Sequence, residues 1–222
     1  MMNKSIFVWA TSLCLMVSVS GMRAGDKLSL KTITSGEFRS EVMQAVCPLP
    51  DGETYGQISS DGKRVESYSF RTGKQVKVLF DVATAQGAKL ERIDDYIMSP
   101  DGRRMLIQTQ TKSIYRHSFT AVFYIYDILH NILEPLSDGG PQQTPVFSPD
   151  GNLIAFVRDN NIYLVNLISD RAECQVTMDG KRNEIINGIP DWVYEEEFST
   201  NSSMVFRLIR VRSSGSAATS VR

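Results

Sequence analysis

Histidine, cysteine and tryptophan are scarce in this chain, and neither sign of charge is in excess. The 222 residues include two histidines, three cysteines and two tryptophans, with 24 basic against 25 acidic side chains. The balanced charge argues against a nucleic-acid-binding protein, which carries a strong basic excess. His117 and His130 have no other metal-ligand residues at a useful spacing, and there is no C-x-x-C pair, so we expect no metal and no other cofactor.

A long apolar segment is lacking except near the N-terminus. Lys4 precedes a mostly apolar run at residues 6–19, and the small residues Ser20, Gly21 and Ala24 follow. This order is typical of a secretory signal peptide, which we predict at residues 1–24, with export to the periplasm, cell envelope or medium. The alternative is an uncleaved membrane anchor, which would need about 20 apolar residues.

Cys47 and Cys174 are the cysteines that follow this segment. An oxidising compartment would permit one disulfide between them. The alternative, which we predict, is a pair of buried free thiols that lie far apart in the folded chain.

One turn signature occurs three times. Residues 58–62 read ISSDG, residues 98–102 read MSPDG and residues 147–151 read FSPDG, and each is followed by a strand-like segment. Pro presets φ early in such a turn, Asp accepts a backbone N–H and Gly tolerates a positive φ. The Asp residues are 40 and 49 positions apart, which is the period of a four-stranded propeller blade.

The segments between the turns favour β-structure. Residues 121–126 and 161–165 are rich in β-branched and aromatic side chains, and polar residues follow each. We therefore predict an all-β fold, a partial β-propeller of about three to four blades over residues 25–206. The alternative is a set of unrelated hairpins.

Two further motifs point to a function. Residues 191–197 read DWVYEEE after NGIP at 187–190, and residues 115–121 read YRHSFTA. In this order, and together with the SPDG-type turns, they resemble the dipeptidyl peptidase IV family over about residues 36–206. The resemblance implies an eight-bladed propeller joined to an α/β-hydrolase domain. It also implies a serine exopeptidase that releases dipeptides, with proline or alanine second, from free amino termini.

The resemblance also implies roles for particular residues. Glu196 and Glu197 would bind the α-ammonium of a peptide substrate with a free N-terminus, and Arg116 would bind a substrate carbonyl. The neighbouring side chains would support this acidic segment: Trp192, Tyr194 and Glu195. Members of the family often form homodimers, which this sequence alone does not predict.

The chemistry of the acidic motif agrees with that role. Pro190 cannot continue a strand and Asp191 is a good N-cap, so we predict a short helix from Trp192. Consecutive carboxylates on a helix point about 100° apart and can flank one ammonium, whose three donors need anionic acceptors. The alternative is a solvated helical face. We interpret His117 as a structural residue and not as a base.

The catalytic motif of this family does not occur in the sequence. Its chemistry needs G-x-S-x-G and a downstream Asp and His, but the 222 residues contain no G-x-S-x-G and no histidine after His130. We expect no catalytic residue, no hydrolase domain and no peptidase activity in this chain alone. The alternatives are a non-enzymatic secreted propeller that binds protein partners in the cell envelope, or a chain that itself binds amino termini.

The pattern changes near Phe206. Residues 203–206 read as a strand that enters a further turn, but RLIRVR and a Ser/Ala-rich segment without acidic residues follow. We predict residues 207–222 to be an aberrant, unstructured tail produced by a frameshift. The alternative is a genuine short protein with a basic tail. A partial propeller also predicts uncovered sheet faces, one of them carrying the apolar residues 154–157.

Overall fold

The computed structural model describes residues 29–36, 45–169, 171–210 and 217–221. The chain divides into two compact units, Met1–Met43 and Gln44–Arg222. In the first unit, the short helix α2 (Leu30–Thr34) begins after Ser29, whose hydroxyl accepts a hydrogen bond from the Thr32 amide. The predicted signal peptide lies outside the described residues. No helix in the described ranges is long and apolar enough to cross a membrane.

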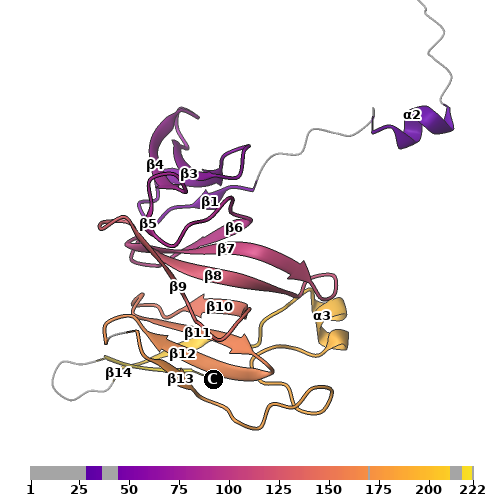
Figure 1. The fold of residues 1–222 in the computed structure, drawn as a ribbon, viewed down its shortest axis with the longest axis vertical. Coiled ribbons are helices and arrows are strands. Elements are labelled where there is room, and N and C mark those ends of the chain that lie inside the picture. The colour runs from indigo at the N-terminus through magenta and orange to yellow at the C-terminus, as the bar shows by residue number, and fades with distance from the viewer. Residues whose placement is uncertain (1–28, 37–44, 170, 211–216, 222) are drawn as a thin grey trace, which may run out of the picture. The chain divides into compact units, whose positions relative to one another are not determined.

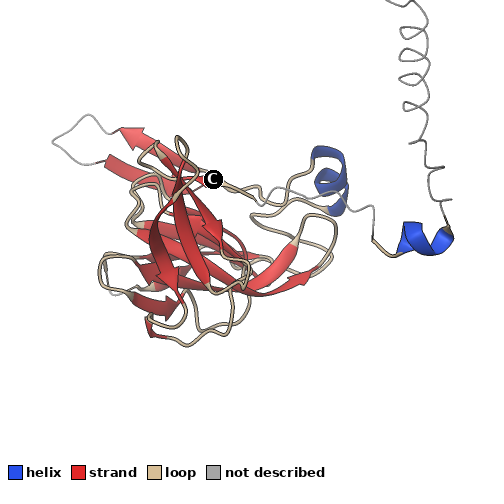
Figure 2. Cartoon of the chain, turned by 90° about the horizontal axis from the view of Figure 1, so that it is seen from above, coloured by secondary structure: helices blue, strands red, loops and turns tan. Residues whose placement is uncertain are grey.

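The second unit consists mainly of antiparallel sheets whose strands lie side by side in the order of the sequence (Figure 1). Strands predominate in it, as Figure 2 shows. The first sheet contains β1 (Cys47–Pro48), β2 (Thr54–Ile58), β3 (Arg64–Ser69) and β4 (Gln75–Asp81). The second contains β6 (Asp95–Met98), β7 (Arg104–Ser113), β8 (Phe119–Asp127) and β9 (Ile132–Pro135), with β5 (Gln86–Gly87) added parallel to β9. The third contains β10 (Gln143–Phe147), β11 (Leu153–Arg158), β12 (Asn161–Asn166) and β13 (Glu173–Gln175).

Three successive four-stranded meanders are the blades that the turn repeat predicted. The all-β fold and the partial propeller are therefore confirmed, and so are the strands expected at residues 121–126 and 161–165, which lie in β8 and β12.

Each predicted turn joins the first two long strands of its sheet in the same way. Gly62, Gly102 and Gly151 have φ values of +68°, +69° and +70°, a conformation that glycine adopts without strain. In the second turn the Ser99 hydroxyl donates to the Asp101 carboxylate at 2.6 Å and accepts from the Arg104 amide at 2.9 Å. The same pair of bonds forms in the other two turns, so the repeat in sequence is a repeat in hydrogen bonding.

The hydrophobic core lies between the sheets and not within them. In β7, Met105 and Ile107 pack towards the first sheet, while Leu106 packs towards the third. Side chains alternate between the two faces of a strand, so a strand between two blades is apolar on both faces. This explains why the middle of β7 reads as an unbroken apolar run.

The third sheet is also covered on both faces, which contradicts the expectation of an exposed apolar face at residues 154–157. Ile154 and Phe156 pack against the second sheet, whereas Ala155 and Val157 pack against Met204, and all four β11 side chains are 0 % exposed. The expectation was wrong because the segment after β13 returns over this face.

The C-terminal segment is more ordered than the sequence suggested. β14 (Phe206–Arg210) pairs antiparallel with β15 (Ala217–Val221), so the expectation of an unstructured tail was wrong for these residues. The strand also begins at Phe206, and residues 203–205 have no regular structure.

Cys47 and Cys174 are both free. They belong to the first and third sheets, which agrees with the prediction of separate thiols. Neither is fully buried, however, since Cys47 is partly exposed and Cys174 is exposed. The prediction of burial was wrong because each lies on an edge strand, which has a neighbouring strand on one side only.

Candidate functional site

The hairpin between β7 and β8 carries the first of the two motifs at its tip. The Ser118 carbonyl accepts hydrogen bonds from the amides of Ile114 at 2.9 Å and Tyr115 at 3.3 Å, which closes the tip. The register of the hairpin shifts between Thr109 and Lys112, and this irregularity bends the strand. The tip therefore extends beyond the sheet, beside α3 (Trp192–Phe198) in Figure 1.

The second motif folds as the predicted helix, α3. Asp191 is its N-cap, since its backbone is extended and its carboxylate accepts from the Tyr194 amide at 2.9 Å. Ser199 ends the helix in the left-handed conformation, with φ of +52°. A helix of two turns thus presents three consecutive glutamates in different directions.

Glu195 is the glutamate that points inward. It is 2 % exposed, and its Oε1 accepts from the backbone amides of His117 and Ser118, both at 2.8 Å. Burial by itself would raise the pKa of Glu195, but these hydrogen bonds outweigh it and hold the pKa below its usual range. Glu195 therefore stays ionised and joins α3 to the hairpin tip.

Glu196 and Glu197 lie on the more open side of the helix. The Glu196 side chain is 24 % exposed, and its Oε2 lies 3.4 Å from Nη1 of Arg116, whose side chain is 71 % exposed. Glu197 is exposed, and its carboxylate has no hydrogen bond or ion pair to any other residue in the described ranges. The structure thus brings Arg116 and Glu196 together. The carboxylate of Glu197, the next residue, has no partner among the described residues.

The aromatic side chains of the motif are not core residues. Trp192 and Tyr194 are 57 % and 58 % exposed. Tyr194 contacts the ring of Phe198 one turn later, with the ring centroids 5.5 Å apart. Tyr194 and Phe198 therefore form an exposed apolar surface on the helix.

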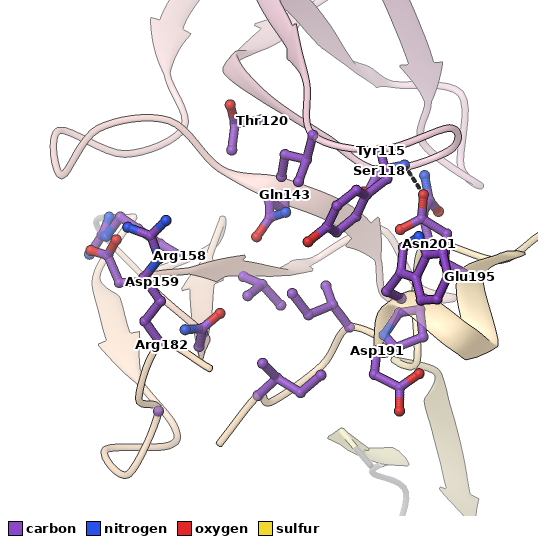
Figure 3. A pocket seen from close by; sticks show the side chains of 18 of the residues that line it. Tyr115, Ser118, Thr120, Gln143, Arg158, Asp159, Arg182, Asp191, Glu195 and Asn201 are labelled. Atoms are coloured by element: carbon purple, nitrogen blue, oxygen red, sulfur yellow. Dashed lines mark hydrogen bonds between the residues drawn. The ribbon is translucent and has the colours of Figure 1, made fainter. Parts of the chain in front are cut away.

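A cavity of about 930 Å³ lies on the other side of α3 (Figure 3). Tyr115, Ser118, Trp192 and Glu195 belong to its lining, but Arg116, Glu196 and Glu197 do not. The cavity and the cluster of exposed charges are therefore different places on the molecule.

No group of three or more His, Cys, Asp or Glu side chains among the described residues could hold a metal ion.

The interpretation of His117 as structural fits its contacts, which come from its backbone. Its amide donates to Glu195, and its carbonyl accepts from the side-chain amide of Asn201 at 3.0 Å. No sequence signal marks Asn201, because a lone Asn after a helix is a common loop residue. Backbone donors such as those of residues 117 and 118 have no sequence signature at all.

The two motifs also lie in the part of the chain that matches a known protein family. Residues 99–207 match the family model described as "Dipeptidyl peptidase IV (DPP IV) N-terminal region". The matched range includes both the hairpin tip and α3. The crystal structure of the Porphyromonas gingivalis dipeptidyl peptidase 4 is similar to this chain with a TM-score of 0.77 and 41 % identity, over 81 % of this chain and 26 % of that one.

The chain belongs to the dipeptidyl peptidase IV family. It corresponds to the N-terminal region of these proteins. The probable dipeptidyl-aminopeptidase B of Podospora anserina is 37 % identical over 81 % of this chain and 21 % of the relative. The human prolyl endopeptidase FAP is 29 % identical over 87 % of this chain and 26 % of the relative. The chain thus spans about a fifth to a quarter of the length of these dipeptidyl peptidase IV relatives.

Proposed function

We propose that this chain supplies the amino-terminus-binding part of a serine-type dipeptidyl peptidase. In this proposal Glu196 and Glu197 accept hydrogen bonds from the α-ammonium of a peptide, and Arg116 donates to the carbonyl of its first residues. The observation that supports it is the 3.4 Å contact between Arg116 and Glu196, which joins the two family motifs across 80 positions of sequence.

The charges of this cluster favour a cation. Arg116, Glu196 and Glu197 together carry a net charge of −1, so one bound ammonium neutralises the cluster. An ammonium has three donors and no acceptor, and the two carboxylates offer only acceptors. Arg116 has only donors, which suits a carbonyl oxygen beside the ammonium. An N-acetylated peptide lacks this charge and would leave the acidic excess unpaired.

The other residues of the motif have supporting roles in this proposal. Glu195 is bonded to the hairpin backbone and so is not available to a ligand. Trp192 and Tyr194 are both exposed on this helix, where such rings are available to the apolar part of a peptide. The family match favours this function over that of a non-enzymatic propeller that binds protein partners.

Binding to the 222-residue chain tests the proposal. Titration of Ala-Pro amide, followed by NMR, should give saturable shifts, and N-acetyl-Ala-Pro amide should bind at least tenfold more weakly. Glu196→Gln should weaken binding of the free dipeptide about tenfold, as expected for about 1.4 kcal/mol from one charge-assisted hydrogen bond. Glu184→Gln, which removes an exposed carboxylate from another loop, is the matched control. Equal binding of the free and acetylated peptides would mean that the glutamates form a solvated helical face and not a binding site.

We further propose that hydrolysis belongs to the longer proteins of the family and not to this chain alone. Carboxylates and a guanidinium can bind a peptide, but formation of an acyl-enzyme needs an activated nucleophile. The purified chain should therefore release no chromophore from a chromogenic dipeptide that ends in proline. Turnover that survives removal of contaminating peptidases would contradict this.

The proposed location is outside the cytoplasm, by means of the predicted signal peptide at residues 1–24. The order of a positive charge, an apolar segment and small residues supports it. N-terminal sequencing of the protein recovered from culture fractions should give a mature end after residues 20–24. An intact N-terminus in the membrane fraction would favour the anchor.

A further inference from the structure

The hairpin tip that carries Arg116 is held by two side chains from the segment around α3. Glu195 accepts from the amides of His117 and Ser118, each at 2.8 Å, and Asn201 donates its side-chain amide to the His117 carbonyl at 3.0 Å. Figure 3 shows Asn201 beside Glu195, next to Ser118 of the tip. All three bonds go to backbone atoms, so they hold the path of the chain and not one side chain.

These bonds restrain the peptide group between His117 and Ser118 at both polar ends. Its N–H donates to Glu195 and its C=O accepts from Asn201. The preceding peptide group, between Arg116 and His117, donates its N–H to Glu195 as well. A peptide plane bonded at both ends cannot rotate without breaking a hydrogen bond. The backbone immediately after Arg116 is therefore fixed in orientation.

Asn201 is itself held in place. Ser199 turns the chain at the end of α3 with φ of +52°, and the Ser203 amide then donates to the Gly188 carbonyl at 3.0 Å. Met204 follows and is 5 % exposed in the core against β11. Asn201 is thus half-buried on a segment that is anchored on both sides, and its amide reaches the tip from a fixed position.

We propose that Asn201 is a positioning residue that acts through Arg116. Together with Glu195 it holds the tip so that the Arg116 guanidinium stands beside Glu196, ready to donate to a peptide carbonyl. This inference rests on the proposed function, since it concerns the same binding cluster. Asn201 itself has no part in binding the ammonium, so its effect is confined to ligands that have a carbonyl.

The test compares two ligands that share the ammonium but differ in the carbonyl. Ala-Pro amide has both groups, whereas isobutylamine has only the ammonium. Asn201→Leu keeps the size of the side chain and removes the donor. It should weaken binding of the dipeptide amide to the 222-residue chain about fivefold, the worth of about one hydrogen bond, and change isobutylamine binding less than twofold. Asn201→Gln, which keeps the donor, should restore part of the dipeptide affinity.

A double-mutant cycle identifies the route of the effect. If Asn201 acts through Arg116, Asn201→Leu should cause no further loss of dipeptide affinity in an Arg116→Ala background. Thr200→Ala is the matched control, because within the described part of the chain the Thr200 hydroxyl bonds only to the Ser202 carbonyl of its own loop. It should leave both affinities unchanged. Additive losses, or equal losses for both ligands, would overturn the proposal.

Amide hydrogen exchange keeps this test separate from the proposed function. Asn201→Leu should accelerate exchange of the His117 and Ser118 amides at least tenfold, while amides in β11 stay protected. Faster exchange at the tip with no peptide binding by the parent chain would refute the proposed function alone. Unchanged exchange at the tip would overturn the positioning role whatever the chain binds.

Discussion

The two ends of strand β7 are held in different ways. At its start, the turn at residues 99–102 is closed by bonds within five residues, including Ser99 to Asp101 at 2.6 Å and the Arg104 amide to Ser99 at 2.9 Å. At its other end, the hairpin tip is held by Glu195 and Asn201, which lie 77 to 84 positions away in sequence. The first end is a local structure repeated in each sheet, and the second is a single long-range junction.

The difference separates scaffold from site. The turns at residues 59–62, 99–102 and 148–151 make the same bonds and differ little between sheets. The tip occurs once and brings charged side chains from distant segments to one place. A turn closed by local bonds can recur along the chain. A long-range junction instead depends on the packing of all the strands that lie between its two segments.

The largest expected loss of stability is at the hairpin tip, the long-range end of β7. Glu195→Ala would leave the half-buried amides of His117 and Ser118 without an acceptor, at a cost of about 2–4 kcal/mol in the free energy of unfolding. Urea denaturation of the 222-residue chain measures it. Glu195→Gln keeps the acceptor oxygen and should cost less, and Glu197→Ala, at an exposed position, should stay within about 0.5 kcal/mol. Equal losses at Glu195 and Glu197 would remove the contrast between the two ends.

At the local end, replacing single glycines with alanine measures the contact between successive turns. A Cβ on Gly151 would meet the Asp101 carboxylate at 3.0 Å and would also be strained at φ of +70°. We expect Gly151→Ala to destabilise by about 2 kcal/mol, of which about half is the left-handed backbone. Gly73→Ala, at φ of +65° with nothing within 4 Å, measures the backbone part alone. Thermal unfolding should show the larger loss for Gly151, and equal losses would mean that the turns do not constrain one another.

Within the repeated turns, burial should set the size of the effect. Ser99 is 0 % exposed, and Ser99→Ala removes one bond to Asp101 and one from the Arg104 amide, so we expect a loss of about 1–2 kcal/mol. Ser59 makes the equivalent bonds at a partly exposed position and should cost less because water replaces them. Chemical denaturation of both variants tests this order. A greater loss at Ser59 would show that the turns are not equivalent.

The smallest effect is the contribution of the turn carboxylates to acid stability. The Ser148 hydroxyl and the Asn152 amide hold the pKa of Asp150 below its usual range despite partial burial, and Ser59 does the same for Asp61. The folded pKa is below the unfolded value of about 3.9, so this stability is complete above that pH and is lost as the pH falls through the folded pKa. Asp150→Asn should therefore flatten the loss of unfolding free energy below about pH 4. An unchanged acid profile would argue against this contribution.

The local features of this protein were determined by its sequence. A Ser-x-Asp-Gly turn satisfies its own polar groups within a few residues, so the three turns and their blade spacing predicted the sheets. Asp191 likewise predicted the start of α3, because an N-cap bonds the amide three residues ahead.

The contacts between distant segments were decided only by the tertiary structure. The covering of β11 by Met204, the burial of Glu195 and the bond from Asn201 to the tip each join positions that no local rule relates. The strand pair at the C-terminal segment was missed for a related reason, since pairing depends on a partner as well as on propensity. The acidic motif could be recognised along the chain, but the choice of which glutamate turns inward depends on how the hairpin tip packs against the helix.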